Sequence, residues 1–215
     1  MKKLPNPLLY FILSLEDIGD LKPIALAKQV LAGGAKVLQL RSKKLNQADL
    51  FSLGQEIKTI CQKHNALFIV NDYPELALKL QADGLHIGQE DLPPTQARKI
   101  VGSTMLLGLS CHNLKQIKQV DPKYVDYIGV GPIYPSSTKI QNNPPLGPNF
   151  LKHIQNINTP FVAIGGITTM NSKNIVAAGC RRIAAISGLS GAKDIGQEAS
   201  LYTRILKGER SWLHS

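Results

Sequence analysis

Polar side chains that could bind a metal ion and an anion recur along the sequence, each just after a short apolar run. Arg41 and Lys43 follow the run Val37–Leu40, and Asp72 and Asp91 follow two later runs. Mg²⁺ is typically held by one or two carboxylates together with substrate phosphates, and fixed cations pair with phosphate oxygens. These residue types favour a site that binds a diphosphate through Mg²⁺ and positive side chains.

A long polar segment follows the apolar run Tyr127–Val130 and continues without a clear structural pattern to Gly147. Loops longer than about 12–15 residues are usually functional or disordered. Hydroxyl groups and one ammonium group fall together in this segment, at Ser136, Ser137, Thr138 and Lys139. They suit a ligand with anionic oxygens, although a solvated surface loop explains the segment equally well when it is taken alone.

Eight short apolar runs alternate with helical patterns along the chain, which is the signature of repeated βα units with a parallel sheet. The expected strands are Leu8–Leu13, Val37–Leu40, Leu67–Val70, Gly84–Ile87, Leu106–Leu109, Tyr127–Val130, Phe161–Ile164 and Ile183–Ile186. Eight units in 215 residues predict an α/β fold, a (β/α)8 TIM barrel in which residues 1–215 form a single domain. An open doubly wound sheet would normally show a glycine-rich fingerprint after the first strand, and Ser14–Asp17 has none.

Helix signals separate these strands. Pro23, and either Pro93 or Pro94, stand where helices can begin, and Asn46 and Asn113 can cap two further helices. We also expect a helix over Gly147–Ile154.

A barrel brings the residues that follow its strands to one rim, where enzymes of this fold keep their active sites. A second phosphate site is expected after the last two strands, where Gly166 and the backbone of Ile186 and Ser187 offer N–H donors. His86 lies inside an expected strand, which indicates a hydrogen-bonded core histidine, and the role of His112 is open. Each feature alone has an ordinary structural explanation, but their coincidence on consecutive strand ends favours a functional site.

The composition excludes several classes of protein. A hydrophobic fraction of 43% without a run of about 18–20 apolar residues indicates a globular protein that does not span a membrane. The net charge of +10 is spread over scattered lysines and arginines, and aromatics make up 6%, so a nucleic-acid surface is not favoured. Three cysteines without metal-ligand spacing predict free thiols in a reducing compartment, and no signal peptide is evident. We therefore expect a cytoplasmic protein.

Six segments, in the same order, resemble the motifs of the thiamine phosphate synthase family. They are Gln39–Lys43, Asn71–Asp72, Gly84–Asp91, Gly108–His112, Gly129–Lys139 and Ala163–Ile167. The resemblance implies a transferase on a (β/α)8 barrel that joins hydroxymethylpyrimidine diphosphate to thiazole phosphate, or to its carboxylated form. It further implies a pyrimidine carbocation, release of pyrophosphate and Mg²⁺ as cofactor.

Residue by residue, the resemblance implies three groups of ligands. The pyrimidine diphosphate would be bound by Gln39, Leu40, Arg41, Ser42, Lys43, Asn71, Ser110 and Lys139, of which Arg41, Lys43, Ser110 and Lys139 would be catalytic. Mg²⁺ would be bound by Asp72 and Asp91, and the thiazole phosphate by Ser136, Ser137, Thr138, Gly166, Ile186 and Ser187. The partners would be these small molecules, with no nucleic acid and no membrane, and a homo-oligomer stays open.

Three departures from the family pattern are visible. Ser136 stands where threonine is usual, Arg181–Arg182 replaces an acidic residue and a glycine, and Ser14–Asp17 lacks the usual Thr-Asp. The related thiazole tautomerases share the barrel and a Ser-x-His segment but need no pyrophosphate-bound metal, so Asp91 and Ser136–Lys139 favour the synthase. A non-catalytic phosphate-ligand or RNA-binding protein would rest on the net charge alone.

Overall fold

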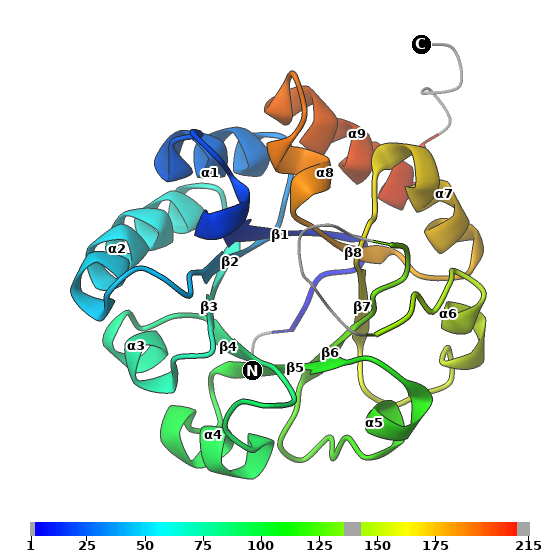
Figure 1. Ribbon diagram of the computed structural model, residues 1–215, viewed down its shortest axis with the longest axis horizontal. Helices are drawn as coiled ribbons and strands as arrows, with labels where there is room; N and C mark the ends of the chain where they lie inside the picture. Colours follow the sequence, from blue (N-terminus) through cyan, green and yellow to red (C-terminus); the bar gives the residue numbers. More distant parts are fainter. Residues whose placement is uncertain (1–2, 136–142, 210–215) are drawn as a thin grey trace.

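The computed structural model describes residues 3–135 and 143–209. Eight parallel strands form a closed barrel in which each strand pairs with the next and β1 pairs with β8. The strands are β1 Leu8–Ser14, β2 Val37–Arg41, β3 Leu67–Asn71, β4 Gly84–Ile87, β5 Leu106–Cys111, β6 Tyr127–Val130, β7 Phe161–Ile164 and β8 Arg182–Ala185. Helices surround this ring of strands on the outside (Figure 1). The predicted (β/α)8 barrel is confirmed.

Strand side chains alternate between the barrel interior and the surrounding helices, as the two-residue period of a strand requires. On β1, Leu8, Tyr10 and Ile12 belong to the interior cluster, whereas Leu9 and Phe11 belong to the larger cluster that packs beneath the helices. Both sets are buried, which explains why the strands are continuous apolar runs in the sequence. The interior cluster lies beneath the polar residues at the strand ends.

The helices begin largely where the sequence places their starts. Asn46 caps α2, with its side-chain oxygen accepting from the Asp49 N–H at 3.0 Å, and Pro23 and Pro94 occupy first-turn positions of α1 and α4. The helical segments are η1 Leu15–Asp17, α1 Pro23–Ala32, α2 Gln47–Lys63, α3 Pro74–Lys79, α4 Pro94–Val101, α5 Leu114–Lys118, α6 Phe150–His153, α7 Thr169–Ala177, α8 Ser187–Ser190 and α9 Ile195–Lys207.

Several expected boundaries differ from the structure by a few residues, and two of them have a clear cause in the backbone. The helix expected from Gly147 begins at Phe150, because Gly147 has φ +73°, outside the range of a right-handed helix. The last strand ends at Ala185 instead of Ile186, whose φ of −122° and ψ of −92° turn the chain into α8. This early exit brings Ser187 onto a short helical turn at the rim of the barrel.

The N-terminal segment runs across the end of the barrel at which the strands begin (Figure 1). Leu4 packs against the interior cluster, and Arg182 donates from Nε to the Pro5 carbonyl at 2.9 Å. Arg182 is therefore part of this lower end, opposite the polar rim. Among the described residues, no helix is long and apolar enough to cross a membrane, and Cys61, Cys111 and Cys180 are buried free thiols.

Candidate functional site

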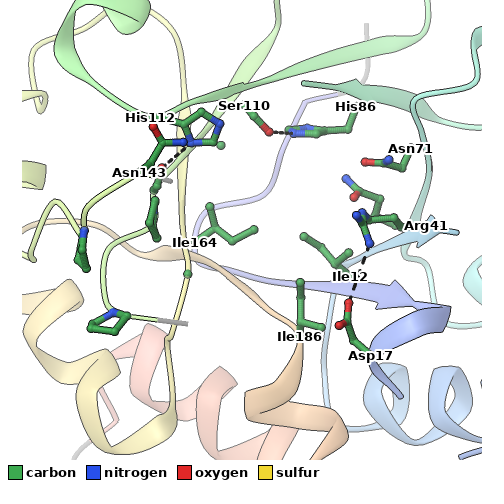
Figure 2. A pocket seen from close by; sticks show the side chains of 17 residues that line it. Ile12, Asp17, Arg41, Asn71, His86, Ser110, His112, Asn143, Ile164 and Ile186 are labelled. Atoms are coloured by element: carbon green, nitrogen blue, oxygen red, sulfur yellow. Dashed lines mark hydrogen bonds and ion pairs between the residues drawn. The ribbon is translucent and has the colours of Figure 1, made fainter. Parts of the chain in front are cut away.

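A pocket of about 360 Å³ opens where the strands end (Figure 2). This is the face on which the loops of a (β/α)8 barrel converge, and the volume lies in the range of small-molecule sites. The lining residues come from around the whole ring: Ile12, Asp17, Gln39, Arg41, Asn71, His86, Ser110, His112, Gly129, Gly131, Pro132, Pro135, Asn143, Pro145, Ile164, Gly165 and Ile186.

Arg41, at the end of β2, supplies fixed positive charge to the pocket. Its Nη1 donates to Ser14 Oγ at 2.7 Å and lies 3.6 Å from Glu16 Oε2 and 3.9 Å from Asp17 Oδ2. The ion pair with Asp17 is visible in Figure 2. Glu16 Oε2 is buried and has no hydrogen-bond partner among the described residues. The two acids, which directly follow β1, therefore fix the position of the guanidinium group.

Glu16 also holds the loop that follows β2. Its Oε1 accepts from Ser42 Oγ at 2.7 Å, from the Lys43 N–H at 2.8 Å and from the Lys44 N–H at 3.2 Å. Burial alone would raise the pKa of Glu16, but these hydrogen bonds together outweigh it, so the pKa lies below its usual value. The carboxylate thus orders the backbone that presents Lys43.

Glu16→Gln is therefore expected to lower the free energy of unfolding by about 1 kcal/mol, the difference between hydrogen bonds to charged and to neutral acceptors. Because the folded state lowers the pKa of Glu16, this contribution is fully present above the unfolded value of 4.5 and is lost as the pH falls through the lower folded value. Thermal unfolding of both proteins from pH 7 to pH 3 checks this. A difference that stayed constant over this range would contradict the assignment.

Asp72 and Asp91 meet at the rim beside Lys43. Asp72 forms an ion pair with Lys43, and Asp91 Oδ2 accepts from the Gly88 N–H at 2.6 Å. Burial, and after it hydrogen bonding to Asp91, raises the pKa of Asp72 despite the neighbouring ammonium group. The hydrogen bond to Asp72 in turn raises the pKa of Lys43, which keeps it cationic.

This pair of carboxylates suits Mg²⁺, which is typically held by one or two carboxylates together with waters and substrate phosphates. No group of three or more His, Cys, Asp or Glu side chains that could hold a metal ion occurs in the described part of the chain. Asp72 and Asp91 are the residues that would hold the ion, and its charge would offset the repulsion between them.

The floor of the pocket is polar and closely hydrogen-bonded. His86 bonds through Nε2 to Ser110 Oγ at 3.0 Å, as Figure 2 shows. His112 Nδ1 lies 2.7 Å from the Gly131 carbonyl oxygen, which can only accept, so Nδ1 is the donor. Gln39 is 2% exposed, and Asn71 is also buried.

Glycines form the opposite side of the pocket, after β7. Gly165 and Gly166 have φ of +101° and +61°, and an added Cβ on Gly166 would lie 2.2 Å from the Pro135 carbonyl oxygen. A second cavity of about 30 Å³ lies here, lined by Gly166 and Ser187 together with Ile186, which also borders the main pocket. Side-chain-free backbone beside a small cavity is the arrangement that backbone N–H groups use to bind phosphate.

The structure brings most of the predicted residues to this rim. Gln39, Arg41, Asn71, Ser110 and Ile186 line the main pocket, Gly166 and Ser187 line the adjoining cavity, and Lys43, Asp72 and Asp91 form the charged cluster. Ser136, Ser137, Thr138 and Lys139 lie outside the described residues.

Two members of the predicted set have their side chains elsewhere. Leu40 packs in the cluster beneath the helices, and Ser42 is 3% exposed with its hydroxyl on Glu16. The reason is the strand period, because Gln39 and Arg41 face the interior and their neighbours face away. The sequence did not predict the hydrogen bond between Tyr10 and Tyr127 beneath the pocket. The signal available for Tyr10 was the two-residue strand period, which places it on the same face of β1 as Leu8 and Ile12.

Comparisons with known proteins agree on one family. The model of the family described as "Thiamine monophosphate synthase" matches residues 9–189. The thiamine-phosphate synthase of Methanospirillum hungatei is 39% identical over 184 residues, covering 85% of this chain and 89% of the relative. That of Chlorobium phaeobacteroides is 38% identical over 199 residues, covering 92% and 97%. The solved structure of thiamine phosphate pyrophosphorylase from Pyrococcus furiosus superposes with a TM-score of 0.85 at 27% identity, covering 94% of this chain and 96% of that one.

Proposed function

Because this chain belongs to the thiamine monophosphate synthase family, and is thus a transferase of thiamine biosynthesis, we propose the two substrates that its pocket joins. They are hydroxymethylpyrimidine diphosphate and thiazole phosphate or its carboxylated form. The products are thiamine phosphate and pyrophosphate, together with CO2 when the thiazole is carboxylated. The observation that carries the proposal is the cluster of Lys43, Asp72 and Asp91 at the rim of the pocket. Such a cluster suits a diphosphate leaving group.

The diphosphate would lie between this cluster and Arg41. Guanidinium and ammonium groups stabilise charge that develops on the departing oxygens, and they need no reorganisation because Glu16, Asp17 and Asp72 already hold them. When bound to Asp72 and Asp91, Mg²⁺ would neutralise further negative charge on the leaving pyrophosphate.

The heterocycles would occupy the main pocket. Gln39, Asn71 and Ser110 offer polar groups to the pyrimidine, and the glycines after β7 offer backbone to the thiazole phosphate. Loss of pyrophosphate leaves a pyrimidine methylene cation, which the thiazole nitrogen captures. This route needs no covalent bond to the protein, so we assign the chain the tasks of positioning and electrostatic stabilisation.

The proposal is tested by mixing the purified protein with both substrates and Mg²⁺. Equal amounts of thiamine phosphate and pyrophosphate are expected, and chelation of the metal should abolish both. The test also separates a second candidate, isomerisation of the thiazole, which is supported by the His112 imidazole that lines the pocket. Isomerised thiazole phosphate without pyrophosphate would establish that candidate and overturn the first.

A further inference from the structure

A chain of hydrogen bonds crosses the barrel interior beneath the pocket. Gln39 donates from Nε2 to Tyr10 Oη at 2.8 Å, and Tyr10 Oη lies 2.9 Å from Tyr127 Oη. Tyr127 Oη lies 3.1 Å from His86 Nδ1, and His86 Nε2 lies 3.0 Å from Ser110 Oγ. These five residues come from five different strands, so the chain depends on closure of the barrel.

The two phenols in the middle of this chain are buried from solvent. Tyr10 is 2% exposed and Tyr127 is 1% exposed. Burial raises the pKa of both hydroxyl groups above the usual value, so each keeps its proton near neutral pH. Each phenol therefore has one proton to donate, and neither lines the pocket.

Two glycines lie beside the contact between Tyr127 and His86, and Gly108 leaves the space that this contact needs. A Cβ on Gly108 of β5 would lie 2.2 Å from Tyr127 Cζ and 2.4 Å from His86 Nδ1. A Cβ on Gly129 of β6 would lie 3.4 Å from His86 Cε1. Any side chain at position 108 would thus push Tyr127 and His86 apart.

One arrangement of protons gives every phenol proton an acceptor within the chain. Gln39 donates to Tyr10, Tyr10 donates to Tyr127, and Tyr127 donates to His86 Nδ1. A neutral imidazole that accepts at Nδ1 carries its proton on Nε2 and donates it to Ser110 Oγ. Ser110 keeps its own proton for an acceptor in the pocket.

Both ends of the chain line the pocket, where Gln39 and Ser110 are set by groups beneath it. The amide nitrogen of Gln39 donates to Tyr10, which leaves the amide oxygen as an acceptor toward the pocket. The hydroxyl of Ser110 is a donor toward the pocket. A heterocycle with an N–H donor beside a ring nitrogen acceptor matches this pair, and an aminopyrimidine has both.

We propose that Tyr10, Tyr127 and His86 are positioning residues that fix Ser110 as a hydrogen-bond donor and Gln39 as an acceptor toward the aminopyrimidine. This inference rests on the proposed function for its substrate. The hydrogen-bond direction itself does not, and it can be measured in the protein without ligand.

The experiment compares Tyr127→Phe, Tyr10→Phe and, as a control, Tyr124→Phe, which lies outside both the chain and the pocket. Nitrogen NMR of the wild-type protein should show the His86 proton on Nε2. Tyr127→Phe removes the donor to Nδ1 and should abolish this preference, whereas Tyr10→Phe leaves Tyr127 free to donate and should keep it. Thermal unfolding verifies that each variant is folded at the temperature of measurement.

Kinetics provide the second readout. Tyr127→Phe should lower kcat/KM for the pyrimidine diphosphate by about 10- to 100-fold, the range seen when a group that orients a ligand is removed. KM for the thiazole phosphate should not change, and Tyr124→Phe should match the wild type. A wild-type His86 proton on Nδ1, or equal kinetics of Tyr127→Phe and Tyr124→Phe, would overturn the inference. An inactive wild type with the expected NMR signature would instead count against the proposed function.

Discussion

Asp91→Asn is expected to lower Mg²⁺-dependent turnover by more than about 100-fold, because even groups that only orient a metal ligand contribute about 10- to 100-fold. The variant should fold, since asparagine keeps an oxygen for the Gly88 N–H that Asp91 accepts at 2.6 Å. Turnover measured against Mg²⁺ concentration should show a large increase in the concentration needed for half-maximal rate. Glu90→Gln, which removes an equal charge from the exposed neighbouring residue, should behave like the wild type.

The same variant has a predicted effect on stability. Burial, and after it Asp91, raises the pKa of Asp72 above 3.8. A carboxyl group with a raised pKa in the folded state binds its proton more tightly there than in the unfolded chain, so the metal-free wild type should lose stability as the pH rises through the raised value. Urea unfolding without metal should show that Asp91→Asn loses less stability than the wild type over the same rise in pH. Identical pH profiles would show that the two carboxylates do not interact.

Gly166→Ala is expected to raise KM for the thiazole phosphate by about 10-fold or more, equivalent to roughly 1.4 kcal/mol of lost binding. The reason is steric, because the added Cβ would lie 2.2 Å from the Pro135 carbonyl oxygen and 2.9 Å from Tyr134 Cβ. The loop after β7 and the segment after β6 would have to separate at the proposed phosphate site. KM for the pyrimidine diphosphate should change little.

Gly208→Ala is the control for this variant. Gly208, at the end of α9, has φ +79° and ψ 22°, in the left-handed region, and an added Cβ would make only an ordinary contact, 3.4 Å from Arg181 Nη1. Both variants therefore place an alanine at a positive φ, at a cost of about 1–2 kcal/mol, and only Gly166→Ala disturbs the site. Kinetics below the unfolding temperature of both variants separate the two effects. An unchanged KM for the thiazole phosphate in Gly166→Ala would show that Gly166 is not part of the phosphate site.

Much of the fold could be predicted because the barrel buries its strands on both sides. Continuous apolar runs such as Leu67–Val70 and Gly84–Ile87 lie within strands of the structure. The errors fall where no hydrophobic pattern exists to be seen. The turn α8, Ser187–Ser190, buries only Leu189 and so has no hydrophobic periodicity. The later start of α6 results from the positive φ of Gly147, which the hydrophobic pattern does not reveal.

The candidate site was also predictable only in part. The position of Arg41, Asp72 and Asp91 on one rim could be predicted because the strand ends of a barrel meet there. The link between Tyr10 and Tyr127 could not, because these residues are 117 positions apart and their meeting depends on barrel register. A contiguous motif does not show which of its side chains face the pocket. Gln39 lines the pocket, whereas the side chain of its neighbour Leu40 packs beneath the helices.

The pairing of β1 with β8 also determines when the protein can mature during its synthesis. Leu8 of β1 is paired with Arg182, so one edge of β1 stays open until β8 has been made. At ribosomal speed this interval is on the order of ten to forty seconds, during which unpaired backbone on β1 can pair wrongly. The pocket is lined by Ile12 of β1, by Asp17 shortly after β1 and by Ile186 directly after β8. Substrate binding therefore requires β8 and cannot precede its synthesis.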